Sequence, residues 1–182
     1  MHTEYEAKVR VEDLDAVEER LKAVGAQAVD VAEEEDAYID LNPCIDVVSR
    51  DVALRVRVYR SLLSGRERYE LTYKGPRKSR DLKIRSEITV AVDNGYRVLE
   101  MLRELGFTKH TTVYKRRKIY RYGAARVFLD DVKGLGKFVE IEVEGVKSVE
   151  EFRRVVAEIL DILNLPKQLI PKSYLEMVLE KS

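Results

Sequence analysis

Several residue types that support particular classes of protein are scarce in this chain. It holds one cysteine and no tryptophan among its 182 residues. The single cysteine, Cys44, excludes an internal disulfide framework and a cysteine-rich zinc site, so we expect it to be an ordinary structural residue. With only two histidines, the residues give no basis for a Ser-His-Asp or Cys-His arrangement. Any chemistry must come from other side chains.

Long apolar runs and a net charge are also absent. No run approaches the ~20 residues that a membrane-spanning helix needs, and the charged amino terminus lacks the core of a signal peptide. The 33 basic residues balance 33 acidic ones, whereas a general nucleic-acid binder is usually strongly basic. We therefore expect a cytoplasmic protein that has neither a membrane nor a nucleic acid as its partner.

What the chain does have is charge, at 36% of its residues, together with 45% apolar residues that can form a core. Its length favours a single domain over residues 1–182. Alternating residues predict strands near 3–11, 27–40, 52–60, 67–75, 84–92, 108–122, 125–132 and 137–144. Apolar residues at helical spacing predict helices over 13–24, 95–105, 148–164 and 174–180, the last capped by Ser173.

One basic stretch lies between these elements. Residues 76–83, PRKSRDLK, have no apolar periodicity and are interpreted as a mobile loop. This loop is either a lid that closes over a substrate or a solvated surface loop.

The predicted order of elements starts again at residue 84, which indicates an internal duplication with halves of about 1–83 and 84–182. A shift of 81 residues superposes Val11 on Val92, Leu21 on Leu102, Gly25 on Gly106 and Glu6 on Glu87. Each half reads as a strand, a helix and three strands. Two such halves supply eight strands, enough to close an antiparallel barrel.

The strands share one alternation: charged residues on one face and aliphatic residues on the other. The charged face carries Glu4, Glu6, Lys8, Arg55, Arg57, Glu70, Lys74, Arg85, Glu87, Lys115, Arg117, Arg126, Asp130, Glu140 and Glu142. In one arrangement the aliphatic residues fill the barrel and the charges face water. In the other the charges line the interior, and the apolar stripes of the helices cover the aliphatic face. The alternation alone leaves both arrangements open.

The mixture of charges indicates what such an interior could bind. Eight bases facing seven acids are tolerable inside a barrel only if they compensate each other or a ligand. Arginine and lysine suit phosphate oxygens, whereas carboxylates can hold Mg²⁺ or Mn²⁺, which bridges to phosphate. Two Glu-x-Glu pairs, Glu4/Glu6 and Glu140/Glu142, each place two oxygen ligands on one face.

The motifs occur in a specific order along almost the whole chain. E-x-E-x-K opens it, and R-x-R in ALRVR, the lysine of ELTYKG, R-x-E in IRSEITV, K-x-R in VYKRRKIY and LDDVKGLGKFVEIEVE follow. This set resembles the CYTH family, also called triphosphate tunnel metalloenzymes. The resemblance implies an α+β fold: a closed eight-stranded antiparallel barrel, or tunnel, with helices packed outside.

The resemblance also implies roles for individual residues. The implied metal ligands are Glu4, Glu6, Asp130, Glu140 and Glu142. The implied phosphate-binding residues are Lys8, Arg55, Arg57, Lys74, Arg85, Lys115, Arg117 and Lys172. Glu4, Glu6 and Lys8 are the implied catalytic residues, Glu87 is expected to pair with a neighbouring base, and Arg126 is expected to be solvated.

The family likeness implies an enzyme that uses Mg²⁺ or Mn²⁺ to act on a small molecule bearing a triphosphate. Hydrolysis of inorganic, nucleoside or thiamine triphosphate is our first expectation. The C-terminal SYLEMVLEK is similar to the ending of class IV adenylyl cyclase-like members, so synthesis of cyclic AMP and pyrophosphate from ATP is the alternative. A non-catalytic module that binds polyphosphate or nucleotides is the second alternative. A homodimer is suggested by analogy with the family alone.

Overall fold

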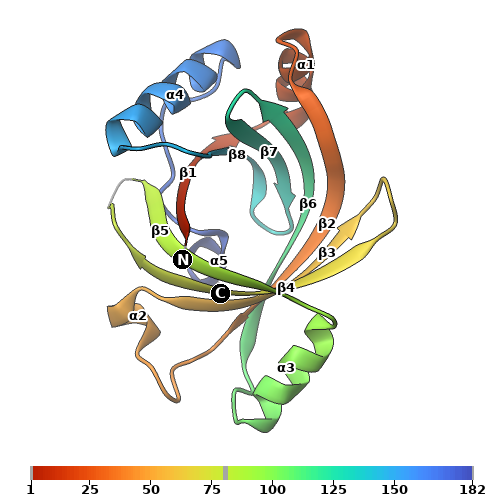
Figure 1. Cartoon of the computed structure of the whole chain (residues 1–182), viewed down its shortest axis with the longest axis vertical. Coiled ribbons are helices and arrows are strands. Elements are labelled where there is room, and N and C mark those ends of the chain that lie inside the picture. Colours follow the sequence, from red (N-terminus) through yellow and green to blue (C-terminus); the bar gives the residue numbers. More distant parts are fainter. Residues whose placement is uncertain (1, 80–81, 182) are drawn as a thin grey trace.

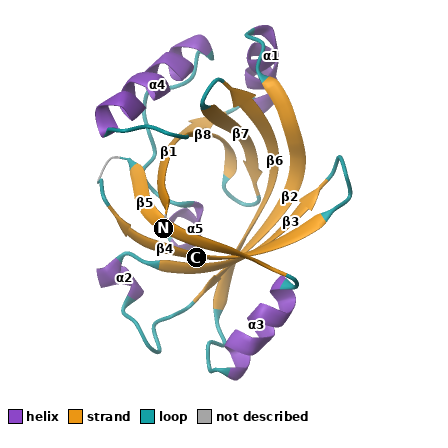
Figure 2. Cartoon of the chain, viewed as in Figure 1, coloured by secondary structure: helices purple, strands orange, loops and turns teal. Residues whose placement is uncertain are grey.

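The computed structural model describes residues 2–79 and 82–181, which contain eight strands and five helices (Figures 1 and 2). The strands are β1 (His2–Val11), β2 (Gln27–Ile39), β3 (Ala53–Ser61), β4 (Glu67–Arg77), β5 (Lys83–Val92), β6 (His110–Tyr122), β7 (Ala125–Val132) and β8 (Gly136–Val143). The helices are α1 (Leu14–Ala23), α2 (Val47–Arg50), α3 (Gly95–Glu104), α4 (Val149–Ile162) and α5 (Tyr174–Leu179).

The strands close into an antiparallel barrel in the order β1-β5-β4-β3-β2-β6-β7-β8. Strand β1 therefore pairs with both β5 and β8, and β2 pairs with β6 on the opposite side. The predicted closed barrel with outer helices is confirmed. The ring of neighbours is unchanged when β1–β4 are exchanged with β5–β8, as a duplication would produce, and the duplication itself stays a prediction.

The outer face of part of the barrel is aliphatic and is covered by helices. Val9 of β1, Val127 of β7 and Ile141 of β8 are buried in one cluster with Leu21 of α1 and Phe152 of α4. Figure 1 shows α1 and α4 lying outside the strands. Asp13 and Ser148 cap these helices by accepting hydrogen bonds from backbone N–H groups of their first turns. The aliphatic face thus points outward, as the second arrangement requires.

The charged face points inward. Lys8 is 1% exposed and Asp130 is 0% exposed, and Arg55, Arg85, Lys115, Arg117 and Glu140 are all buried. Charged side chains are rarely buried unless they are paired, so this interior depends on ion pairs.

Two apolar clusters bound the charged interior. Ala32, Tyr59, Ile119 and Phe128 form one of them. In the other, Tyr174 of α5 packs against Val113, Val132 and Phe138. The short helix α5 begins at a capping box, in which Ser173 and Glu176 each bond the backbone of the other. The predicted cap at Ser173 is confirmed, and it aims Tyr174 into the end of the barrel.

Residues 76–83 differ from the predicted mobile loop at both ends. Pro76 and Arg77 continue β4, and Lys83 begins β5. The register between β4 and β5 shifts after Lys74, a bulge that hides the strand pattern from a reading by periodicity. Residues 80–81 lie outside the described part, and the lid interpretation stays a prediction.

One helix was not expected: the single turn α2, which begins after Asp46 and ends at Asp51 with a left-handed φ of 48°. Four residues carry too little apolar periodicity to be recognised. Among the described residues, no helix is both long enough and apolar enough to cross a membrane.

Candidate functional site

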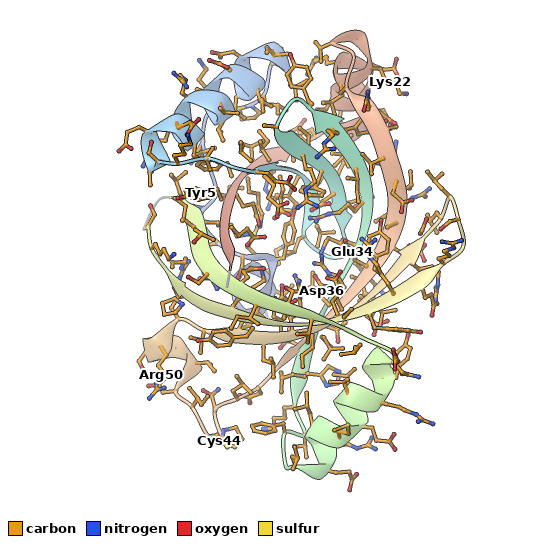
Figure 3. The ribbon with its side chains drawn as sticks, in the orientation of Figure 1. Tyr5, Lys22, Glu34, Asp36, Cys44 and Arg50 are labelled. Carbon is orange, nitrogen blue, oxygen red and sulfur yellow. The ribbon has the colours of Figure 1, made fainter. Side chains whose placement is uncertain are left out.

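Most of the charged residues predicted from sequence meet in one cavity inside the barrel, about 100 Å³ in volume, whereas Lys8, Asp130 and Lys172 are not part of its lining. Its lining includes Glu4, Glu6, Arg55, Arg57, Lys74, Arg85, Lys115, Arg117, Glu140 and Glu142. Figure 3 shows Glu34 and Asp36 within the ring of strands, whereas Lys22 and Cys44 lie on peripheral segments. A larger hollow of about 530 Å³ lies against the outward side chains of β2 and β6, including Glu33 and Tyr114. Of the predicted site residues, only Lys115 lines this hollow, so the interior cavity is the candidate site.

Four glutamates from β1 and β8 form one wall of this cavity. The strands place Glu6 opposite Glu142 and Lys8 opposite Glu140. Burial and the charge of Glu140 raise the pKa of Glu6 to about 7. Burial and the charge of Glu4 raise the pKa of Glu142 to about 8. We call Glu4, Glu6, Glu140 and Glu142 the carboxylate wall.

A base that the sequence reading assigned to the loop lies against this wall. Lys83, the first residue of β5, forms ion pairs with Glu6 and with Glu140, the latter at 3.6 Å. Glu6 and Lys83 are also neighbours in the register of β1 and β5. The ammonium group thus brings a positive charge between two carboxylates of adjacent strands.

Lys8 lies deeper on the same side. Its Nζ is 3.1 Å from Glu140, donates to the carbonyl of Lys172 at 3.2 Å, and is 3.5 Å from the centre of the Tyr174 ring. Burial and the nearby charge of Lys83 lower the pKa of Lys8 to about 8. Such a lysine can lose or regain a proton near neutral pH.

The opposite wall carries the bases of β3 and β6 together with two acids of β2 that the sequence reading missed. Asp36 accepts from Nε and Nη2 of Arg57 at 2.5 and 2.7 Å and from Lys115 at 2.8 Å. Glu34 lies 2.8 Å from Lys115 and 3.1 Å from Arg57. We call Glu34, Asp36, Arg57 and Lys115 the paired wall.

The pKa values of these acids move opposite to those of Glu6 and Glu142. Burial by itself would raise the pKa of Glu34, but the charges of Arg57 and Lys115 lower it to about 2. Against the same effect of burial, Arg57 and Lys115 hold the pKa of Asp36 well below its usual value. Both acids are therefore ionised at neutral pH, and they fix the bases in place.

Two arginines keep donors to spare. Arg55 donates through Nη2 to Thr72 at 3.2 Å, and Arg85 donates through Nη2 to Asp51 at 3.4 Å. The Nε groups of both arginines are buried and find no hydrogen-bond acceptor among the described residues. A buried donor without an acceptor is costly, so these N–H groups are suited to the oxygens of an anion.

Asp130 is placed differently from the other predicted metal ligands. It is 0% exposed, and its two oxygens accept from Nε and Nη2 of Arg117 at 2.7 and 2.6 Å. The Tyr174 hydroxyl donates to it at 2.8 Å. Asp130 is not among the residues that line the cavity.

Three further predicted residues lie toward the edges of the site. Lys172 is half exposed and its side chain pairs with Glu180 at 2.7 Å, so only its backbone carbonyl reaches Lys8. Glu87 pairs with Lys74, as expected. Arg126 is 44% exposed, and it also contacts Glu142 at 2.7 Å.

The missed residues left different signals in the sequence. Glu34 and Asp36 alternate with Glu33 and Glu35 in the run EEED, which hides the inward face because both faces are acidic. Tyr174 begins the C-terminal helix, and no pattern shows that this helix enters the barrel. Lys83 could have been found only by extending β5 backward by one residue.

The fit of a divalent cation can be judged from the donors. The carboxylate wall offers only oxygen ligands, which suit Mg²⁺ or Mn²⁺, and the mutual repulsion that raises the pKa values of Glu6 and Glu142 would be relieved by a cation. Among the described residues, however, no three acidic, histidine or cysteine side chains form a ready-made cage. Glu4, Glu6, Glu140 and Glu142 thus fit a cation by their chemistry, whereas Asp130 is already held by Arg117 and Tyr174.

Comparison with known proteins agrees with this geometry. The family model described as CYTH domain matches residues 2–174. A Methanocaldococcus jannaschii protein named "Putative adenylate cyclase" is 33% identical over 178 residues, which cover 96% of this chain and 97% of that protein.

Solved structures show the same fold. A Pyrococcus horikoshii protein is 34% identical, with a TM-score of 0.84 over 98% of this chain and 99% of its own. A Hippeastrum protein described as having a dominant triphosphatase activity has a TM-score of 0.70 over 98% of this chain and 96% of its own. It is 18% identical, so that likeness concerns the fold alone.

Proposed function

This chain belongs to the CYTH domain family, and we propose that it hydrolyses a triphosphate bound inside the barrel with the help of Mg²⁺ or Mn²⁺. The observation that carries the proposal is the pair of buried Nε groups on Arg55 and Arg85 without acceptors. They lie in the cavity that the carboxylate wall also lines. One cavity thus combines free donors for phosphate oxygens with oxygen ligands for a cation.

The bases supply the binding step. Arg55 and Arg85 present planar donors to phosphate oxygens, and Lys74 adds a compact charge from the neighbouring strand. Lys74 now pairs with Glu4 at 3.4 Å and with Glu87, so an entering phosphate competes with these acids. Because the phosphates are held by fixed groups in a dry interior, the bases also stabilise charge that grows during transfer.

The carboxylate wall would hold the cation through Glu4, Glu6, Glu140 and Glu142. When bound there, the cation supplies charge neutralisation and lowers the pKa of a coordinated water. The pKa of about 7 at Glu6 lets its carboxyl group hold or release a proton at neutral pH. Lys8 contacts Glu140 of the carboxylate wall at 3.1 Å, and with a pKa of about 8 it can hold or release a proton there near neutral pH.

The name of the M. jannaschii relative favours a second function, an adenylyl cyclase. The same bases would bind the triphosphate of ATP, and the ribose 3′-oxygen would replace water as the nucleophile. Hydrolysis is preferred because water needs no aligned ribose, and the sequence carries no motif for adenine recognition.

An assay panel tests the proposal. The protein is incubated with inorganic triphosphate, ATP or thiamine triphosphate, each with Mg²⁺, with Mn²⁺ or with a chelator, and the products are separated. Cation-dependent release of orthophosphate is expected. If ATP instead yields cyclic AMP and pyrophosphate, the proposed hydrolase is wrong and the protein is a cyclase. If none of the three substrates is turned over, a binding module is favoured.

The carboxylate wall has its own test. Glu6→Gln keeps the size of the side chain but removes a cation ligand, so we expect it to abolish cation-dependent turnover while the circular dichroism spectrum is retained. Glu33→Gln is the matched control, because Glu33 lies on the outward face of β2 and is exposed. Full activity of Glu6→Gln would show that the assignment of the cation site is wrong.

A further inference from the structure

Asp130 and Arg117 form a bidentate ion pair inside the barrel. They are directly opposite each other in the register of β6 and β7, and the carboxylate accepts two parallel hydrogen bonds at 2.7 and 2.6 Å. Such a two-bond fork fixes the plane of the guanidinium as well as its position. Asp130 is 0% exposed, so its oxygens are shielded from bulk solvent.

Arg117 is also held on its other sides. Its guanidinium lies 4.2 Å from the centre of the Phe128 ring, and Nη2 contacts Glu140 of the carboxylate wall. The Nη1 group is used by neither acid, and its ion-pair partner Glu34 is 4.0 Å away. Arg117 lines the cavity, and among the described residues its Nη1 group has only this long ion pair with Glu34 and no hydrogen-bond acceptor.

Tyr174 ties this unit to the C-terminal helix. Its hydroxyl donates to the same oxygen of Asp130 that accepts from Nη2 of Arg117. Its ring packs edge-on against Phe138 at 5.2 Å and lies under the ammonium group of Lys8. Tyr174 therefore contacts Asp130, which holds Arg117, and it also contacts Lys8.

The first half of the barrel contains a matching unit with the charges exchanged. There Asp36 is on β2 and Arg57 on β3, whereas in the second half Arg117 is on β6 and Asp130 on β7. Both pairs are directly opposite in register, and both use Nε and Nη2. The recurrence favours a common purpose for the two aspartates, which is to aim an arginine.

We propose that Asp130 is a positioning residue that acts with Tyr174 to aim Arg117 at the bound phosphates, and that it is not a ligand of the cation. This rests on the proposed function, since it assigns a role in binding the same triphosphate. It departs from the role that the family resemblance implies for Asp130, because both of its oxygens are committed to Arg117 and Tyr174 and neither lines the cavity.

The first test does not depend on any substrate. In ¹⁵N-labelled protein at pH 6, the Nε–Hε signal of Arg117, assigned with Arg117→Lys, is expected to be sharp and to exchange slowly with water. Asp130→Asn should broaden it or make its exchange fast, and Tyr174→Phe should do so to a lesser extent. Asp131→Asn is the matched control, since Asp131 is the next residue and is exposed. An unchanged Arg117 signal in Asp130→Asn overturns the proposal, whatever the protein's activity.

The second test separates a positioning residue from a cation ligand. In chelator, calorimetry should show inorganic triphosphate binding to Asp130→Asn about 10- to 100-fold more weakly than to wild type. The Mn²⁺ concentration that half-saturates binding of the cation alone should stay within about twofold of wild type, whereas Glu140→Gln should raise it about tenfold or more. If Asp130→Asn raises the half-saturating Mn²⁺ concentration as much as Glu140→Gln does and leaves triphosphate binding unchanged, the proposal is overturned.

The design also covers two ways in which these variants could mislead. If Asp130→Asn does not fold, Tyr174→Phe keeps the volume and removes only the hydroxyl group, so its Arg117 signal and triphosphate affinity decide. If wild type binds no triphosphate, the proposed function fails, and the Arg117 signal still reports whether Asp130 orients the arginine.

Discussion

The carboxylate wall and the paired wall face each other across one cavity, yet two acids of the first, Glu6 and Glu142, behave in the opposite way to the acids of the second. Against the effect of burial, the nearby lysines hold the pKa values of Glu4 and Glu140 well below the usual value. On β1 and β8, Glu6 and Glu142 meet other carboxylates, and their pKa values rise to about 7 and about 8. On β2, Glu34 and Asp36 each pair with three bases, and their pKa values fall. All four are buried or nearly so, so burial alone does not decide the direction. The neighbours decide it.

The difference separates two uses of a buried acid. A carboxylate that already has three bases is ionised and rigid, and it has little left to offer a ligand. A carboxylate that lies among other carboxylates is repelled by their negative charges, and a bound cation would relieve that repulsion. The two walls therefore divide the labour of the proposed reaction between holding the bases in place and binding the cation.

The largest expected effect comes from breaking the paired wall. Arg57→Met removes one of the three bases that pair with Asp36 and leaves a buried charge undercompensated. The free energy of unfolding should fall by about 3–5 kcal/mol, measured by urea unfolding at pH 7. Adding Asp36→Leu to Arg57→Met should restore much of the loss, because the stranded charge is then gone. A loss below about 1 kcal/mol in the single variant would contradict the ionic account of this wall.

A smaller effect is expected when pH is changed without the cation. Glu142 has a pKa near 4.5 in the unfolded chain and about 8 in the fold, so its protonated form is favoured by folding. Its contribution to stability is complete below pH 4.5 and is lost as pH rises toward 8. Urea unfolding in chelator should show a decline of about 1–3 kcal/mol over this range, and Glu142→Gln should reduce it. If wild type and Glu142→Gln lose stability equally over this range, the pH dependence comes from other groups.

The paired wall should respond at the opposite end of the pH scale. The pKa of Glu34 is lowered from 4.5 to about 2, so its contribution is present above pH 4.5 and is lost as pH falls toward 2. Glu34→Gln should make the acid limb of the stability curve shallower and leave the limb above pH 5 unchanged. Carboxyl ¹³C shifts through an acid titration would check the assignment directly.

The smallest effect is expected outside the barrel, at an ion pair that belongs to neither wall. Arg60 contacts Glu67 at 2.5 Å, but its side chain is 49% exposed. Exposed pairs contribute about 0–1 kcal/mol, so Arg60→Gln should change the free energy of unfolding by no more than that. A change as large as that of Arg57→Met would show that location inside the barrel is not what matters.

Particular residues show which features of the fold and the site could be predicted from the sequence. Strand β7 was predicted at 125–132 and is found there, because its alternation is clean and turns flank it. The bases Arg55, Lys115 and Arg117 were placed together on the charged face and lie in the cavity. Lys83 was missed because the bulge after Lys74 disturbs the pattern on which the strand assignment depends. Asp130 was placed on the correct face, but its partners were not foreseen.

The sequence by itself determined the order of the strands and of the helices other than α2, the alternation of charged and aliphatic faces, and the family. These are properties of residues near one another along the chain, and periodicity records them. Only the tertiary structure decided that the charges face inward, that Asp130 serves Arg117, and that Glu6 and Glu34 have opposite pKa shifts. Closing the barrel brings residues from distant strands within about 3 Å, and the interaction between charges depends on that distance and on the water excluded around them.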